Sequence, residues 1–247
     1  MRTSTYVASA SAALLCASAA SAANLIQNGG FDSNGGSGQV NFNTSISNWS
    51  VSALPNSYVF VFNSGTADVV GSTVGQYGEV NLWGPNNGSA NGLPASSPAG
   101  GAFIASNPAF QNGPISQTIT GLTKGQKYTL TFEWAGSQQF TFSGANTEGW
   151  QVSFGGQTLS TPIASLVSHG FSGWMPASFT FTADGTSDVL SFLALGGPTE
   201  AEPPFALLDG VSLVEVPEPT TWALLLTGVG LLGAVRRRRR QVVLATG

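Results

Sequence analysis

YTLTFEW, residues 128–134, alternates apolar and polar side chains with a period of two residues. The Tyr, Leu, Phe and Trp side chains fall on one face of an extended chain, and the Thr and Glu side chains fall on the other. This alternation is typical of an antiparallel strand with one face on a core and the other in water. Similar short runs recur at 46–51, 58–62, 101–105, 115–120, 150–154, 177–182, 188–195 and 205–214. Glycine-rich turns separate the runs, so the sequence predicts an all-β fold, a single antiparallel jelly-roll β-sandwich.

Residues 84–101 interrupt this alternation of apolar and polar residues. They are rich in Gly, Pro, Ser and Asn and have no periodicity. Loops of that length inside a compact domain are uncommon, and they are usually either functional or disordered. Of these two interpretations, we expect disorder in preference to function.

The N-terminus has the three parts of a secretory signal peptide. Arg2 gives a basic start, a run of apolar and small residues follows, and small residues surround Ala22. A signal peptidase substrate needs these features in this order. We therefore expect residues 1–23 to be a signal peptide, with cleavage after Ala22 or Ala23.

A short apolar segment at residues 220–235 lies near the C-terminus. As a helix it would be about 24 Å long, slightly less than the ~30 Å hydrocarbon core of a bilayer. Five arginines follow it, and carrying them across a membrane would be costly, so they stay on the cytoplasmic side. The sequence thus predicts a C-terminal transmembrane helix, with the preceding domain outside the cytoplasm.

This tail resembles the PEP-CTERM sorting signal of Gram-negative bacteria that produce exopolysaccharide. The residues that carry the likeness, beside the apolar helix, are Pro217, Glu218, Pro219, Arg236, Arg237, Arg238, Arg239 and Arg240. In that family an exosortase-type membrane protease is thought to recognise the tail and release or transfer the protein. The resemblance implies a protein at the cell surface or in the extracellular matrix of a Gram-negative bacterium, held transiently in the inner membrane. Residues 241–247 are a departure, because such tails often stop at the basic cluster.

Residues 24–216 remain between the two signals and are enough for one domain with a sizeable core. Lys124 and Lys127 are their only basic residues against eleven acidic ones, a net charge of −9. Such an acidic domain is poorly suited to nucleic acid or anionic membranes, so we expect neutral or cationic partners. Cys16, the only cysteine, leaves with the signal peptide, so we expect no disulfide.

Residues 76–83, QYGEVNLW, offer the groups that bind sugars. Aromatic rings can stack on apolar sugar faces, while amide and carboxylate groups bond to sugar hydroxyls. In an extended strand Tyr77, Glu79, Asn81 and Trp83 would share one face. Trp150, which follows a loop at 143–149, is a further candidate. The alternative for each aromatic residue is a place in the core, where aromatic residues of strands usually lie.

Catalysis has little support in the sequence. His169 is the only histidine and has no nucleophile motif beside it, so we expect a solvated loop residue. Glycoside hydrolysis needs two carboxylates roughly 5–10 Å apart. Glu79, Glu133 and Glu148 offer such groups, but nothing in the sequence brings two of them together. We expect that the protein is not an enzyme.

Asp209 stands out within the run at 205–214. It shares one parity with Phe205, Leu207, Val211 and Leu213, which are core residues in type. A carboxylate among core residues must accept hydrogen bonds or coordinate a cation. Capping of backbone N–H groups at the strand end and cation binding both remain open.

The order of elements resembles the galactose-binding-like jelly rolls of many carbohydrate-binding modules. The likeness rests on NLIQNGGFD at 24–32, ISNW at 46–49, ISQTI at 115–119, GQKYTLTF at 125–132 and ALLDGVSL at 206–213. Those modules often hold a structural calcium that joins the first strand to the last. The resemblance thus implies a calcium site at Asp32, Asp209 and a carbonyl near Asn28. Gly210 stands where the family often has a second acid, and calcium prefers six to eight oxygens.

These features together predict an exported, non-enzymatic protein of the surface or exopolysaccharide matrix, with a structural or adhesive role. The alternative is a lectin-like carbohydrate-binding module that takes one glycan specifically. A polysaccharide hydrolase is a third and weaker hypothesis.

Overall fold

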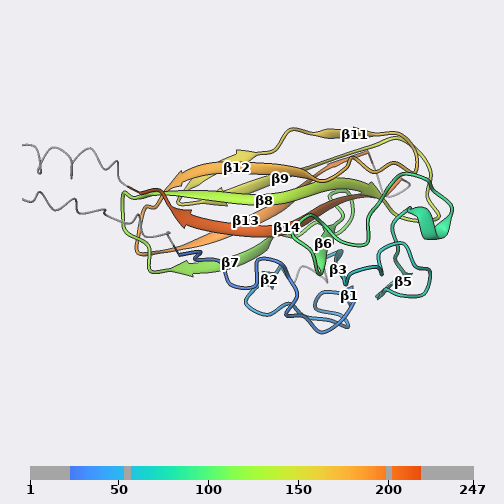
Figure 1. The fold of residues 1–247 in the computed structure, drawn as a ribbon, viewed down its shortest axis with the longest axis horizontal. Coiled ribbons are helices and arrows are strands. Elements are labelled where there is room, and N and C mark those ends of the chain that lie inside the picture. The colour runs from blue at the N-terminus through green and yellow to red at the C-terminus, as the bar shows by residue number, and fades with distance from the viewer. Residues whose placement is uncertain (1–22, 53–56, 199–201, 218–247) are drawn as a thin grey trace, which may run out of the picture.

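The computed structural model describes residues 23–52, 57–198 and 202–217 of the 247-residue chain. The predicted transmembrane helix, and all but the last residue of the predicted signal peptide, lie outside these ranges. Within them, no helix is long and apolar enough to cross a membrane. The fold is all-β and antiparallel, as predicted (Figure 1).

Two sheets face each other. The first has the order β1 (Gly38–Gln39), β3 (Val59–Phe62), β6 (Phe103–Ser106), β14 (Pro204–Glu215), β8 (Lys127–Gln138) and β12 (Met175–Thr182). The second has the order β10 (Gln157–Ser160), β9 (Asn146–Phe154), β13 (Ser187–Gly197), β7 (Ile115–Thr120) and β2 (Ser50–Val51), with β11 (Ala164–Leu166) beside β9. A separate hairpin joins β4 (Val74–Gly75) to β5 (Gly78–Glu79), and a short 3-10 helix, η1, spans Pro85–Asn87. This is the predicted jelly-roll sandwich.

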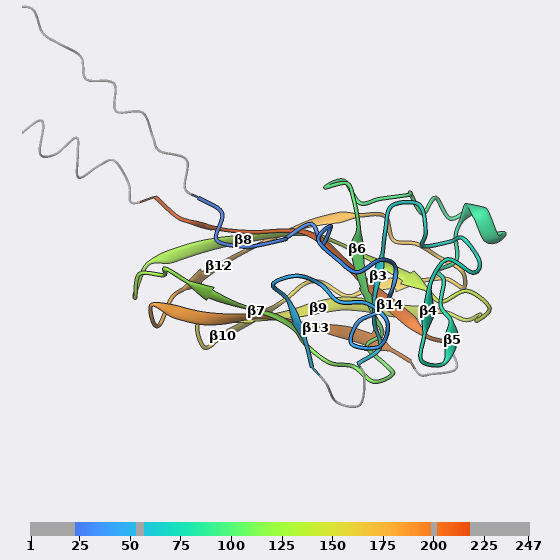
Figure 2. The same ribbon diagram turned by 90° about the horizontal axis from the view of Figure 1, so that it is seen from below.

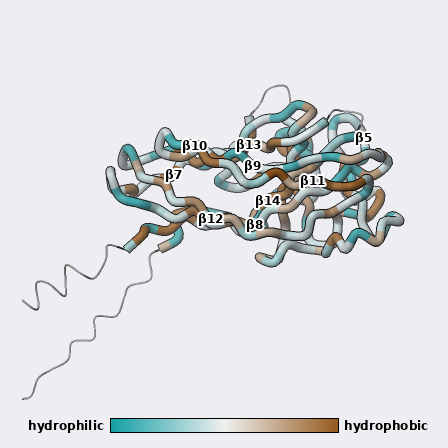
Figure 3. Tube along the Cα trace, turned by 90° about the horizontal axis from the view of Figure 1, so that it is seen from above, coloured by the Kyte–Doolittle hydropathy of each residue, from teal (hydrophilic) through white to brown (hydrophobic). Residues whose placement is uncertain are grey.

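The alternation at 128–134 has the predicted physical basis. Tyr128, Leu130, Phe132 and Trp134 are buried in the core between the two sheets. Figure 3 shows hydrophobic stretches along the strands of both sheets. Burying each large apolar side chain contributes about 1.5–3 kcal/mol, so the segment 128–134 is held chiefly by its inward face.

A second core covers the outer face of the first sheet. There Phe60, Phe103, Phe205 and Leu207 pack against side chains from residues 67–93, including Leu82. This layer explains why β8 and β14 are buried on both faces over part of their length. Leu93 of the polar stretch at 84–101 packs into this layer, and the stretch has a defined path that includes the short helix η1, so the expectation of disorder was wrong.

The two described ends of the chain lie side by side (Figure 2). The Leu25 N–H donates to the Leu213 carbonyl at 2.9 Å, and the Leu213 N–H donates to Asn24 Oδ1 at 3.0 Å. The β4–β5 hairpin lies at the opposite end of the long axis (Figure 1).

Candidate functional site

An open groove of about 260 Å³ lies beside the β4–β5 hairpin. Its aromatic lining comes from Tyr58, Tyr77, Phe110 and Phe142. These residues are far apart in the chain and are brought together by the hairpin, by the residue that precedes β3 and by the loops after β6 and β8. We call this feature the Tyr77 groove.

The hairpin presents Tyr77 at its tip. Gly75 pairs with Gly78, so only two residues form the turn. A side chain at Gly75 would have its Cβ 2.8 Å from the Phe60 ring, and Gly78 has a φ of +111°, so both positions favour glycine. The local sequence therefore holds the hairpin close against the sheet and leaves Tyr77 projecting.

Tyr77 is exposed yet held in place. Its side chain is 62 % exposed, and its hydroxyl accepts a hydrogen bond from Gln111 Nε2 at 2.7 Å. Its ring lies edge-on to Phe110 with centroids 5.5 Å apart, and 6.2 Å from Tyr58. Such edge contacts contribute about 0.5–1.5 kcal/mol each beyond area burial. The ring is thus a preorganised apolar surface open to a ligand.

Polar groups lie around these rings. Glu79 on β5 is exposed and lines the groove with Asn107 and Gln139. Asn107 Oδ1 accepts the N–H groups of Ala109 and Phe110, which fixes the loop that carries the Phe110 ring. Burial raises the pKa of the Tyr58 hydroxyl to about 12, so this group stays neutral. The groove therefore combines rigid rings with a carboxylate, amides and a neutral phenol.

Asn81 and Trp83 are not brought to this groove with Tyr77 and Glu79. Asn81 is 3 % exposed, and its Nδ2 donates to the Val69 carbonyl and to Ser72 Oγ. The predicted strand at 76–83 ends at Glu79, so the shared face does not extend along the whole stretch. Asn81 instead fixes the loop before the hairpin.

Trp83 lies in a separate cluster with His169. The two rings stack with centroids 3.8 Å apart and an interplanar angle of 26°, and Trp83 Nε1 donates to the Phe142 carbonyl at 2.7 Å. His169 Nε2 lies 2.8 Å from Ser143 Oγ. The His169 N–H donates to Gln138 Oε1, and φ at His169 is +64°. His169 lies in a turn and is half-buried, so the predicted loop position is confirmed, but its ring is held by these contacts rather than free in solvent.

Trp150 lies in the core between the sheets. It is 0 % exposed, and its Nε1 donates to the Leu207 carbonyl at 2.9 Å across the sandwich. Its ring also lies 6.1 Å from that of Phe192, nearly perpendicular to it. The prediction of a ligand contact at Trp150 is corrected to a core role, because the opposite sheet covers the ring.

The three glutamates of the hydrolase hypothesis lie in different surroundings. Glu79 is exposed on the hairpin, whereas Glu133 is on β8 and pairs in register with Asp209. Glu148 on β9 is 0 % exposed, and burial raises its pKa to about 9. Since its carboxyl is closed off from solvent, Glu148 cannot meet a polysaccharide at the surface in this conformation.

Asp32 and Asp209 do lie near each other. A Cβ placed on Gly30 would be 3.4 Å from Asp32 Oδ2 and 3.8 Å from Asp209 Oδ1. Asp209 is fully buried; it accepts hydrogen bonds from the Ser97 hydroxyl and, at 2.7 Å, from the Gly210 N–H. Burial, with smaller contributions from the charges of Asp32 and Glu133, raises the pKa of Asp209 to about 7.

This geometry bears on the two alternatives for Asp209. The bond from the Gly210 N–H is of the predicted capping kind, whereas Ser97 donates through its side-chain hydroxyl and Asp209 lies within β14 rather than at its end. For calcium, Asp32 and Asp209 would supply carboxylate oxygens, and a cation there would offset their mutual repulsion. Within the described ranges, however, no group of three or more His, Cys, Asp or Glu residues is placed to hold a metal. Calcium at this pair stays a prediction.

The chain belongs to the DUF642 family of proteins of unknown function, whose profile matches residues 78–206. The PEP-CTERM protein-sorting motif matches residues 215–240, which confirms the predicted sorting tail and indicates an exported protein of the cell envelope. Halomucin from Haloquadratum walsbyi is 30 % identical over 205 residues, 79 % of this chain, and the chain spans 2 % of halomucin's length.

Solved structures with a similar arrangement include carbohydrate-binding modules. A family 4 module is 16 % identical with a TM-score of 0.34, covering 77 % of this chain and 99 % of the module. The CBM22-1 xylan-binding domain from Paenibacillus barcinonensis is 11 % identical with a TM-score of 0.37, covering 82 % of this chain and all of that domain.

Proposed function

We propose that this protein is an adhesive component of the cell surface or exopolysaccharide matrix, which binds polysaccharide through the Tyr77 groove and performs no catalysis. The observation that carries the proposal is the exposed Tyr77 ring, fixed by Gln111 and by contacts with Phe110 and Tyr58. A ring that is already ordered loses little conformational entropy on binding, so more of the stacking energy appears as affinity.

The chemistry of the groove suits a sugar chain. The C–H faces of a pyranose ring stack on Tyr77, while Glu79 and Gln139 lie within the same groove to bond with hydroxyl groups. Most of the lining is neutral, which matches the expectation of a neutral or cationic partner for a domain of net charge −9. Specific recognition of one glycan, as by a lectin, is the narrower form of this proposal.

The sorting tail supports the rest of the proposal. We propose that residues 1–23 are removed as a signal peptide, that residues 24–216 form the mature domain, and that residues 217–247 are the sorting tail. Residues 220–235 then hold the precursor in the inner membrane of a Gram-negative host until an exosortase-type protease processes it.

Substitution at the groove tests the binding site. We expect Tyr77→Ala to weaken binding of the full-length protein to the host's exopolysaccharide about tenfold, the effect of losing ~1.4 kcal/mol. Tyr77→Phe keeps the ring and should retain most of the affinity. Leu159→Ala, at an exposed apolar side chain of β10, is the matched control. Binding by Tyr77→Ala at the wild-type level, measured by affinity electrophoresis, would remove this site.

A further inference from the structure

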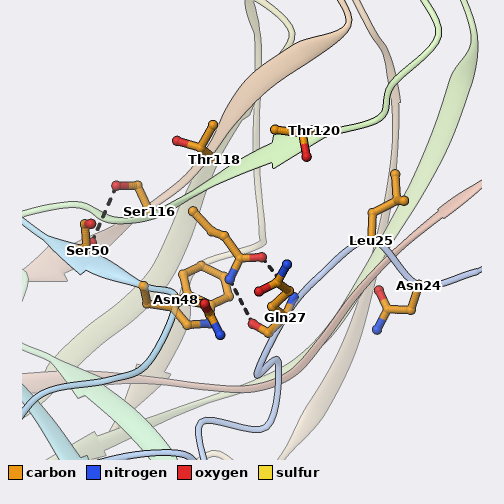
Figure 4. Close-up of a pocket in the computed structure, with 10 residues that line it drawn as sticks. Asn24, Leu25, Gln27, Asn48, Ser50, Ser116, Thr118 and Thr120 are labelled. Atoms are coloured by element: carbon orange, nitrogen blue, oxygen red, sulfur yellow. Dashed lines mark hydrogen bonds between the residues drawn. The ribbon is translucent and has the colours of Figure 1, made fainter.

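A larger cleft of about 630 Å³ lies away from the Tyr77 groove, between β7 and the N-terminal segment (Figure 4). Ser116, Thr118 and Thr120 line one wall, and Asn24, Gln27 and Asn48 line the other. The side chains of all ten residues that line this cleft are uncharged, and eight of them carry amide or hydroxyl groups. We call it the β7 cleft.

The β7 cleft follows the free edge of a strand. β2 pairs with β7 only at Ile115 and Ser116, and the Ser52 N–H donates to the Pro114 carbonyl. Along an antiparallel strand, alternate residues turn their backbone N–H and C=O groups to the same side. Thr118 and Thr120 therefore turn theirs toward the cleft, where the described strands provide no pairing partner.

The opposite wall is fixed rather than loose. Gln117 Oε1 accepts the Gln27 N–H at 2.9 Å, and Gln117 Nε2 donates to the Gln27 carbonyl at 2.8 Å. Trp49 Nε1 donates to the Asn28 carbonyl at 3.0 Å. These bonds tie the N-terminal segment to the sandwich, so the cleft is formed before any ligand arrives.

We propose that the β7 cleft is a second polysaccharide-binding site, which takes a neutral sugar chain. Both walls offer hydroxyl and amide groups that can each donate and accept, and the backbone of Thr118 and Thr120 adds further donors and acceptors. The strongly acidic domain around it disfavours an anionic chain. A peptide strand would find only two residues of free edge, so the sugar chain is the better fit.

This inference rests on the proposed function and extends it. The Tyr77 groove lies by the β4–β5 hairpin at one end of the molecule, whereas β7 lies toward the other end (Figure 1). The two sites cannot form one continuous surface for a single short sugar. One molecule therefore binds two polysaccharide chains, or two stretches of one chain, and cross-links them.

Blocking each site separately tests the inference. A glycan array with the full-length protein in mild detergent first selects a neutral polysaccharide that binds, and turbidity then reports cross-linking of that polysaccharide. Thr118→Arg fills the cleft with a long side chain at an exposed position of the edge strand. Val189→Arg is the matched control, because Val189 is the register partner of Thr118 on β13, is 51 % exposed and does not line the cleft.

We expect wild type and Val189→Arg to cross-link, and Tyr77→Ala and Thr118→Arg each to bind without cross-linking. If Thr118→Arg cross-links like wild type, the second site is wrong while the Tyr77 groove stands. If Tyr77→Ala cross-links like wild type and Thr118→Arg does not, the Tyr77 groove is not a binding site, whereas the β7 cleft still is. Absence of any glycan binding, or binding of extended peptides that Thr118→Arg alone abolishes, overturns the inference. Thr120→Arg replaces Thr118→Arg if circular dichroism shows that the latter is unfolded.

Discussion

Trp83 and His169 lie face to face, with ring centroids 3.8 Å apart, although 86 positions separate them in the chain. The contact ties the loop before η1 to the loop that follows β11. Ser89 and Asn91 reinforce the same junction by donating to the His169 carbonyl. The contact between Trp83 and His169 therefore stabilises the segment that covers the outer face of the first sheet, in addition to the apolar side chains of the second core.

Removing the histidine ring should loosen this junction. We expect His169→Ala to lower the free energy of unfolding by about 1 kcal/mol, because stacking is lost and Ala is strained at positive φ. His169→Gly loses the ring but relieves the strain, so the two variants separate the effects. Acrylamide quenching of tryptophan fluorescence should increase in both. Unchanged melting and quenching would show that the stacked pair carries no stability.

Asp209 should make stability depend on pH. Its carboxyl has a folded-state pKa of about 7, raised from the ordinary 3.8, so the folded state holds its proton more tightly than the unfolded chain. Between about pH 4 and pH 7 the free energy of unfolding should therefore fall as pH rises. Asp209→Asn should flatten this slope, as measured by urea unfolding at several pH values. Glu148, with a pKa of about 9, should extend the decline to higher pH, and Glu148→Gln is the corresponding variant.

Bound calcium would favour the ionised form of the Asp209 carboxylate, whereas burial favours the protonated form. An ion bound between Asp32 and Asp209 neutralises their repulsion and favours the ionised form. We expect calcium to raise the melting midpoint of the wild type at pH 8 and to leave Asp209→Asn unchanged. A wild-type midpoint that is the same with calcium and with a chelator would remove the calcium site and leave hydrogen bonding as the sole role of Asp209.

The sorting tail gives a prediction in the cell. Replacing Pro217, Glu218 and Pro219 with alanines should leave the precursor membrane-bound and uncleaved, because the recognition motif is gone while the apolar segment and the arginines remain. Fractionation and immunoblotting measure this. An unchanged released fraction would mean that the tail is only an anchor. The experiment requires a host whose genome encodes an exosortase.

The alternation at 128–134, together with the similar runs and glycine-rich turns elsewhere, predicted the sandwich, since one face of that strand meets the core and the other stays more open. Beyond Trp134 the same strand is buried on both faces. The reason lies in residues 67–93, which cover the sheet from outside, and local periodicity carries no trace of so distant a partner.

The site was predictable only in part for the same reason. Trp150 lies within strand β9 and is enclosed by the opposite sheet, whereas Tyr77 lies in the two-residue turn between β4 and β5 and is exposed. Tyr58 and Phe110, which complete the groove, come from other parts of the sequence. The sequence did not predict the β7 cleft, because the free edge of β7 depends on how far the neighbouring strand β2 extends.

The hydrogen bond between Leu25 and Leu213 brings both ends of the domain to one pole. The β4–β5 hairpin, whose turn carries Tyr77, lies at the opposite end of the domain from that pole (Figure 2). The last described backbone bond before the tail runs from the Val216 N–H to the Lys127 carbonyl. Cutting the chain beyond that point would leave the β14 pairings intact, so the proposed processing of the tail would not disturb the fold that positions the Tyr77 groove.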